Sequence, residues 1–192
     1  MKYCTNARRV AGAFWWFGIC LLFAGVLNTG NAQVIDKLTY NELQAAYIYK
    51  IASLVSWPDG THFEHFTVCV VEPAEEVSRF IRDAVGKRTI NGLPVVVIQL
   101  SADRLVSAAD FSPCQLVYLL EPVHNQAIPD VAEQPHGTPV IWVSAPSVQA
   151  NGTALFELAL EGRRLVIYVN REQLRSSGLQ VAAPLLSVAR PR

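Results

Sequence analysis

Residues Phe66 to Glu72 read FTVCVVE, and the fold of the whole chain follows from this short stretch. Its residues are mostly apolar and β-branched until Pro73, after which residues 74–81 follow the pattern of a helix. A continuous apolar run this short, followed by a helical pattern, is typical of a buried strand that opens a β-α-β unit. We therefore predict a buried strand here and a helix directly after it.

Three later runs share this apolar character: Leu93–Leu100, Gln115–Glu121 and Pro139–Ser144. Together, the four runs predict a mostly parallel central sheet with flanking helices. Two more runs, Leu155–Leu160 and Leu165–Asn170, flank the turn sequence EGRR and predict an antiparallel hairpin at the C-terminal edge of the sheet. The predicted fold class is a single-domain α/β protein.

A long amphipathic helix is predicted from Tyr40 to Ser56, where apolar residues recur at spacings of three and four. Thr39 or Asn41 is expected to cap its start, and Pro58 to end it. The expected apolar stripe, interrupted only by Lys50, consists of Leu43, Ala46, Tyr47, Ile51, Leu54 and Val55.

The composition is that of a globular protein, because 51% of the 192 residues are hydrophobic and 17% are charged. A chain of this size can bury a core within one domain. It has 16 basic and 16 acidic residues and no basic patch. Nucleic acid is therefore not expected as a partner.

The first 32 residues have the pattern of a secretory signal, with Lys2, Arg8 and Arg9 before the uncharged apolar segment Val10–Leu27. Small residues place the expected cleavage after Ala32 and leave residues 33–192 as the exported domain. An uncleaved anchor is the alternative, since a membrane span takes about 17 to 25 residues. Without the three leader cations, 13 basic residues face 16 acidic ones, a net charge of −3.

Export would remove Cys4 and Cys20 with the leader and leave Cys69 and Cys114 in an oxidising compartment. We expect these two to form a disulfide. For the loop that it would close, the chain-entropy model gives a stabilisation of about 4 kcal/mol. Two buried free thiols are the alternative.

The sequence has no nucleophile elbow, phosphate loop or His-Glu-x-x-His motif. The segment HFEH at 62–65 offers three metal donors, but it lacks a fourth ligand and helical spacing, so an exposed loop is favoured. At the first strand-to-helix turn, Glu75 and Glu76 would repel a phosphate. We therefore predict no enzyme activity, no nucleotide binding at this turn and no metal or other cofactor.

Several segments follow one another in a characteristic order: QAAYIYKI at 44–51, VSWP at 55–58, VCVV at 68–71, GKRTI at 86–90, CQLVY at 114–118, VIYVN at 166–170 and GL at 178–179. In their order and spacing, over residues 40–189, the chain resembles the YfiR-like family of periplasmic proteins. The resemblance implies a dimer-forming α/β protein that represses a membrane-bound diguanylate cyclase by binding the periplasmic sensor region of the cyclase. It also implies an OmpA-like outer-membrane lipoprotein that sequesters the repressor.

The positions that match the cysteine bridge of the family are Cys69 and Cys114. A second cysteine pair found in some members has no counterpart here, and paired glycines of the family appear as Asn151-Gly152-Thr153. Redox switching tied to the second pair is therefore not expected.

An inhibitory protein of this kind would bind through exposed apolar or aromatic side chains that the core does not need. Near the C-terminus, a short helix is predicted at Arg171–Ser177, stopped by Gly178, with an apolar tail at 184–188. The candidates for partner binding lie around these segments, with a packing role as the alternative: Tyr168, Leu179, Leu185 and Leu186.

Two other classes of function remain open. A small-ligand sensor would need a pocket, expected between the loops at 121–126 and 145–151. A secreted hydrolase would need a base, for which His124 and His136 are available.

Overall fold

The computed structural model describes residues 36–58, 62–86, 88–105, 107–123, 138–146, 148 and 154–192. The chain divides into two compact units, Met1–Gln33 and Val34–Arg192, and the described residues belong to the second. The predicted leader and its cleavage after Ala32, His124, His136 and the segment 151–153 lie outside the described residues. No helix in the described part of the chain is long and apolar enough to cross a membrane.

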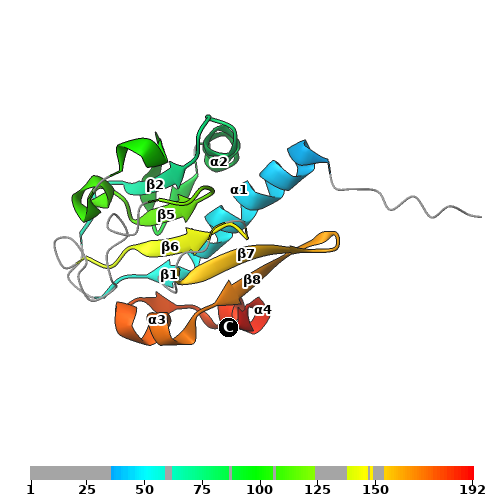
Figure 1. Cartoon of the computed structure of the whole chain (residues 1–192). Coiled ribbons are helices and arrows are strands. Elements are labelled where there is room, and N and C mark those ends of the chain that lie inside the picture. Colours follow the sequence, from blue (N-terminus) through cyan, green and yellow to red (C-terminus); the bar gives the residue numbers. More distant parts are fainter. Residues whose placement is uncertain are drawn as a thin grey trace, which may run out of the picture. The chain divides into compact units, whose positions relative to one another are not determined.

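An eight-stranded sheet with the order β10-β8-β7-β6-β5-β2-β4-β3 forms the centre of the second unit (Figure 1). Its strands are β2 (Phe66–Val71), β3 (Thr89–Ile90), β4 (Leu93–Leu100), β5 (Leu116–Leu119), β6 (Ile141–Ser144), β7 (Phe156–Glu161), β8 (Arg164–Val169) and β10 (Arg190–Pro191). The pairs from β4 through β2, β5 and β6 to β7 are parallel, while β3 with β4 and β7 with β8 are antiparallel. The predicted α/β class, parallel centre and edge hairpin are confirmed.

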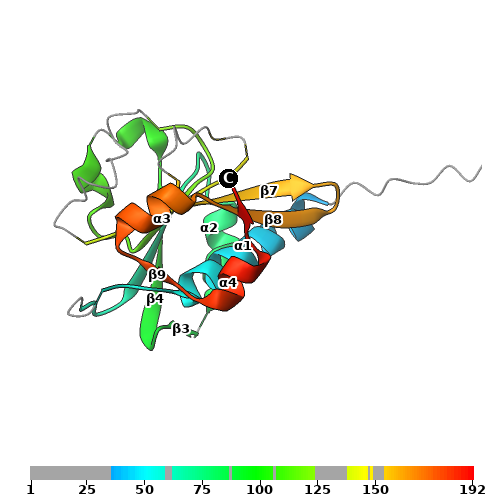
Figure 2. The same cartoon turned by 90° about the horizontal axis from the view of Figure 1, so that it is seen from below.

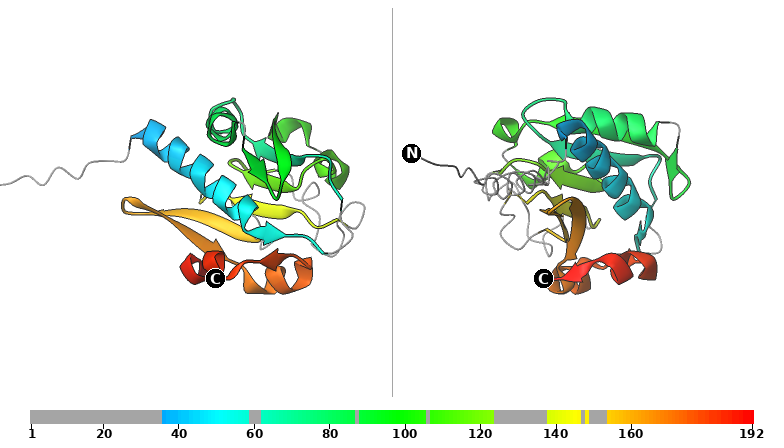
Figure 3. Two further views of the ribbon diagram at one scale, coloured as in Figure 1. Left: turned by 180° about the vertical axis from the view of Figure 1, so that it is seen from behind. Right: turned by 90° about the vertical axis from the view of Figure 1, so that its right-hand side faces the viewer.

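Helices α1 (Lys37–Ser53) and α2 (Val77–Val85) pack against each other on one face of this sheet (Figure 3). The connection from β4 to β5 contains two 3₁₀ turns, η1 (Ala102–Arg104) and η2 (Ala108–Phe111). The ring of Phe111 in η2 lies 5.0 Å from that of Trp142 in β6, centroid to centroid. Trp142 pairs with Val117 of β5, whereas the neighbouring Tyr118 contacts α1. Because successive strand residues point to opposite faces, η2 covers the face opposite α1.

The long helix begins earlier and ends earlier than its sequence pattern predicts. It ends at Ser53, and Val55–Ser56 forms strand β1, which pairs with β9 (Gln180–Val181) in a separate two-stranded sheet. Neither Thr39 nor Asn41 caps the helix, because the N-cap residue is Asp36 and it makes no side-chain capping bond. Residues 54–56 leave the helix because their backbone pairs with the C-terminal part of the chain.

The predicted apolar stripe of α1 is also wrong in part. Ala46 is exposed, and the buried residues are Asn41, Gln44, Ala45, Ile48, Ile51 and Ala52. Apolar side chains occur around most of this helix, so a spacing of three and four can be traced on more than one face. The face of α1 that packs into the core begins with the polar residues Asn41 and Gln44.

The C-terminal segments form helix α3 (Arg171–Ser177), strand β9 and helix α4 (Ala183–Val188), which follow one another along one side of the unit (Figure 2). Asn170 caps α3 by accepting hydrogen bonds from the backbone N–H groups of Glu172 and Gln173. Gly178 ends α3 with a φ of 72°, a left-handed conformation that favours glycine. The predicted helix is confirmed at both ends, and the predicted tail at 184–188 lies in α4, which leads into β10.

Candidate functional site

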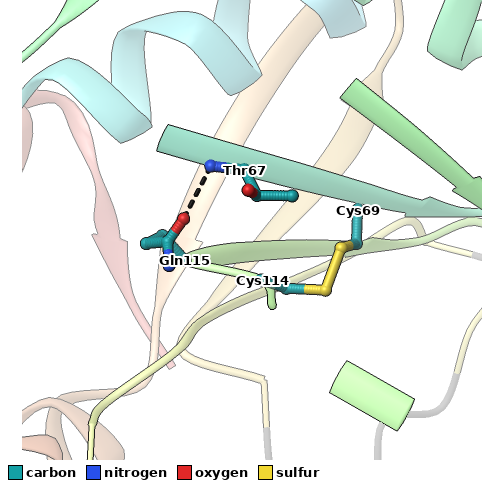
Figure 4. The surroundings of a disulfide bond; sticks show 4 residues. All are labelled: Thr67, Cys69, Cys114 and Gln115. Carbon is teal, nitrogen blue, oxygen red and sulfur yellow. Dashed lines mark hydrogen bonds between the residues drawn. A yellow bond between two sulfur atoms is a disulfide. The ribbon is translucent and has the colours of Figure 1, made fainter. Parts of the chain in front are cut away.

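Cys69 and Cys114 form a disulfide that joins β2 to the residue two positions before β5 (Figure 4). Their Cα atoms are 5.8 Å apart, and both residues are buried. Cys69 pairs with Val117 in the parallel register, so its side chain points to the face covered by η2 and away from α1. The predicted bridge is confirmed, and its burial indicates a structural role.

A cavity of about 560 Å³ lies at the carboxyl ends of the central strands. Strand β2 pairs with β4 on one side and with β5 on the other, so the chain changes direction between β2 and β5. Open α/β sheets bind their ligands at such a topological switch point. We call this cavity the switch-point pocket; its walls are Lys37, Tyr40, Asn41, Gln44, Glu72, Pro73, Ala74, Glu76, Val77, Leu120, Ala145 and Pro146.

Glu72 lines the pocket and caps the N-terminus of α2. Its carboxylate accepts hydrogen bonds from the backbone N–H groups of Val77, at 2.8 Å, and Ser78, at 2.9 Å, and the residue is only 2% exposed. These are the donors that would otherwise bind a phosphate. The absence of nucleotide binding stays a prediction, but its physical reason changes from Glu75 and Glu76 to Glu72.

The two glutamates named from the sequence form ion pairs instead, and only Glu76 lines the pocket. Glu76 lies 2.6 Å from the ammonium nitrogen of Lys37, and Glu75 lies 3.7 Å from the guanidinium of Arg82. Both pairs are exposed, so they contribute little to stability.

Asn41 and Gln44, which line the pocket, form a buried polar network with Tyr118. The hydroxyl of Tyr118 donates to Oε1 of Gln44, and Nε2 of Gln44 donates to Oδ1 of Asn41 at 3.3 Å. Burial, followed by the nearby Tyr40 and Glu72, raises the pKa of Tyr118 well above its ordinary value of 10.0. Tyr118 therefore keeps its proton and remains a hydrogen-bond donor at physiological pH.

Of the two loops expected to form the pocket of a small-ligand sensor, residues 124–126, 147 and 149–151 lie outside the described residues. Among the described lining residues, Ala145 and Pro146 belong to the second of these loops, and most of the others come from α1 and from the turn between β2 and α2. Sequence reasoning missed α1 because it treated Asn41 and Gln44 as lying off the apolar stripe. The signal was present, since Asn41, Gln44, Ala45 and Ile48 follow the spacing of one helix face.

The chemistry of the pocket suits binding. Among its described lining residues there is no serine, threonine, cysteine or histidine that would act as a nucleophile or as an imidazole base. In the described ranges, no three His, Cys, Asp or Glu side chains lie close enough together to hold a metal ion. The groups that line the pocket are amides, carboxylates, an ammonium, a phenol and apolar side chains.

The four candidates for partner binding separate into two groups. Leu179 is 6% exposed and Leu185 is fully buried, so the expectation that they form an exposed surface is wrong. Both pack into the core because β9 and α4 fold back onto the rest of the domain, where a free tail was expected. Leu186 is 41% exposed, and Tyr168 is partly exposed on β8.

Tyr168 belongs to a cluster of polar side chains on the outer face of the hairpin. Its hydroxyl donates to Glu161, which also lies 2.7 Å from the guanidinium of Arg190. The guanidinium of Arg192 lies 5.6 Å from the centre of the Tyr168 ring and donates to Glu157. We call these five residues, Glu157, Glu161, Tyr168, Arg190 and Arg192, the hairpin network.

The fold and the site define a class of protein: a disulfide-bonded α/β domain with a pocket at the switch point of its sheet. Residues 41–190 match the model of the YfiR/HmsC-like family, and the chain belongs to this family. No curated protein matches the chain. The family is periplasmic, regulatory and non-catalytic, and membership indicates a regulator of diguanylate cyclase signalling. The disulfide is consistent with export to the periplasm.

Proposed function

We propose that this protein represses a membrane-bound diguanylate cyclase by binding the periplasmic sensor region of the cyclase, which lowers cyclic di-GMP and biofilm formation. The observation that carries the proposal is the family match over residues 41–190. The Cys69–Cys114 disulfide supports it, because a structural bridge between buried residues is expected in a protein that works in an oxidising compartment.

The surface proposed for the cyclase is the outer face of the hairpin together with α4. Arg190 of β10 pairs with Tyr168 of β8, and α4 leads directly into β10, so these segments are continuous. Leu186 and Val188 add exposed apolar side chains, with 41% and 63% of their surface accessible. An aromatic residue, arginines and exposed leucine or valine side chains are suited to a protein interface.

Two further associations belong to the same proposal. The protein forms a homodimer, and an OmpA-like outer-membrane lipoprotein sequesters it away from the cyclase. Both follow from the family resemblance. Light scattering of the purified protein tests the dimer, and co-purification with the lipoprotein from envelope extracts tests the second partner.

The binding test uses the mature protein and the purified periplasmic region of a cyclase encoded in the same genome neighbourhood. We expect co-elution in size-exclusion chromatography, weakened at least about ten-fold, or 1.4 kcal/mol, by Tyr168→Asp or Leu186→Asp. Leu38→Asp is the matched control, because Leu38 is 59% exposed at the start of α1, outside the proposed surface.

Each variant is melted beside the wild type, so that a folding defect is not read as a binding defect. If the wild-type protein does not bind the sensor region, the proposed mechanism is wrong. If it binds and both the Tyr168 and Leu186 variants bind equally well, the mechanism stands and the proposed surface is wrong.

A further inference from the structure

The switch-point pocket has the place and the size of a small-molecule site. It lies where the carboxyl ends of β2, β5 and β6 meet the first two turns of α1, and its volume is about 560 Å³. Binding sites for small molecules typically measure about 300 to 1,000 Å³ and combine an apolar lining with a few placed polar groups. The pocket has both kinds of lining.

Two polar side chains that line the pocket, Asn41 and Gln44, are buried. Asn41 is 6% exposed and Gln44 is 1% exposed, and they continue the stripe that becomes apolar at Ala45 and Ile48. Oδ1 of Asn41 accepts from Gln44, but Nδ2 of Asn41 has no hydrogen-bond partner among the described residues. This N–H donor is also not among the fully buried side-chain atoms that lack a partner, so it is accessible to a ligand or to water.

Asn41 is one of the lining residues of the pocket, so its amide is available there. Tyr40, on the preceding position of α1, lines the same wall, and burial raises the pKa of its phenol. The pocket therefore offers groups for hydrogen bonding to a ligand.

The charged residues that line the pocket favour a cationic ligand over an anionic one. Its ionisable lining residues, apart from the neutral phenol of Tyr40, are Lys37, Glu72 and Glu76, one cation against two carboxylates. Lys37 and Glu76 are paired with each other at 2.6 Å, so the excess negative charge comes from Glu72, whose carboxylate also takes the N-terminal donors of α2. An anion would meet a net negative charge and no vacant backbone donors at this helix, whereas a cation would be attracted.

A metal ion fits this pocket less well than an organic cation. Hard metal ions need six or more oxygen ligands, usually with several carboxylates, and the described residues contain no suitable group of three. The lining also contains apolar residues, among them Leu120, Ala145 and Pro146. An organic cation with a compact apolar body would use both kinds of lining residue.

We propose that the switch-point pocket binds a small organic ammonium ion, with the ammonium group toward Glu72 and Glu76 and the apolar body against Leu120 and Ala145. This activity goes beyond the proposed repression, because it requires only the protein and the ligand. It gives the periplasmic regulator a site for a small molecule that is separate from the hairpin and α4.

The test compares three probes that share one apolar body and differ in charge: benzylamine, benzyl alcohol and benzoate. Each is titrated to about 10 mM into the ¹⁵N-labelled mature protein, a concentration range that detects millimolar dissociation constants. We expect saturable shifts for benzylamine at the amides of Ala74, Val77, Leu120 and Ala145. Benzyl alcohol should bind more weakly, and benzoate should leave these signals unchanged.

Two variants locate the site and test the charge. Ala74 is exposed at the rim, so Ala74→Trp should obstruct the pocket without disturbing the core and weaken benzylamine binding at least ten-fold. Ala46→Trp is the matched control on the exposed face of α1 and should bind like the wild type. Glu76→Gln should weaken benzylamine several-fold and leave benzyl alcohol unchanged.

Three results would overturn the proposal. The first is no saturable shift with benzylamine at the pocket amides while the spectrum is that of a folded protein. The second is equal binding of the three probes, or preferred binding of benzoate. The third is benzylamine binding that Ala74→Trp does not weaken. None of these outcomes bears on repression, which is measured without the probes.

Discussion

Two tyrosine hydroxyls make similar hydrogen bonds in very different surroundings. Tyr118 is fully buried and donates to Gln44, whereas Tyr168 lies on the outer face of the hairpin and donates to Glu161. If Gln44 is replaced by an apolar side chain of similar size, the buried hydroxyl of Tyr118 loses its acceptor, which costs about 1 to 3 kcal/mol. If Glu161 is removed, water takes its place. The buried network therefore supports the fold and shapes the pocket, while the hairpin network can change with little effect on stability.

The largest loss of stability is expected from the disulfide, on the face of β2 opposite the buried network. Replacing both cysteines, Cys69→Ser with Cys114→Ser, should lower the free energy of unfolding by about 2 to 5 kcal/mol, because the closed loop spans 45 residues. Urea denaturation measures this change. As a control, thiol titration of the denatured, unreduced wild type should find no reactive thiol. Two thiols per chain would contradict the assignment.

An intermediate loss is expected from the buried network itself. Gln44→Leu leaves the hydroxyl of Tyr118 without its acceptor and should cost about 1 to 3 kcal/mol. Adding Tyr118→Phe removes the unsatisfied hydroxyl, so the double variant should be more stable than the sum of the two single changes predicts. A double-mutant cycle by urea denaturation measures this coupling, and strict additivity would show that the two groups do not depend on each other.

The smallest loss is expected from the hairpin network. Glu161→Gln should shift the urea midpoint much less than Gln44→Leu does, because its partners are exposed. The Tyr168 hydroxyl, and then Arg190, lower the pKa of Glu161 below its ordinary value of 4.5. A lowered pKa in the folded state stabilises the fold above that ordinary value, and this contribution is lost as the pH falls through the lowered pKa.

The difference between wild type and Glu161→Gln should therefore shrink below pH 4.5 and also at high salt, where exposed charges are screened. Midpoints measured across pH and ionic strength test this. A large shift at neutral pH that persists in high salt would place Glu161 among the residues that support the fold.

Sequence patterns were sufficient for the parts of the molecule that depend on local composition. The apolar run predicted as a strand forms β2 at Phe66–Val71, and Gly178 ends α3 as predicted, because a buried strand and a glycine at a helix end are local requirements. The pairing of Cys69 with Cys114 was predictable because only two cysteines lie outside the predicted leader.

Features that depend on distant segments were not predictable in the same way. Leu179 and Leu185 are buried because β9 pairs with β1, more than a hundred residues earlier in the chain. The switch-point pocket combines side chains from Lys37 to Pro146, and no short pattern reports their proximity. Glu72 looked like the end of a strand, and only the placement of α2 shows that it caps that helix.

The proposed repression is tested by measuring cyclic di-GMP in cells that express the cognate cyclase. Deleting the gene should raise cyclic di-GMP and surface attachment, and restoring the full-length gene should reverse both. A version without residues 1–32, which is not expected to be exported, should fail to restore repression. If deletion leaves cyclic di-GMP unchanged while the cyclase is expressed, the protein is not its repressor, and ligand sensing at the switch-point pocket becomes the leading function.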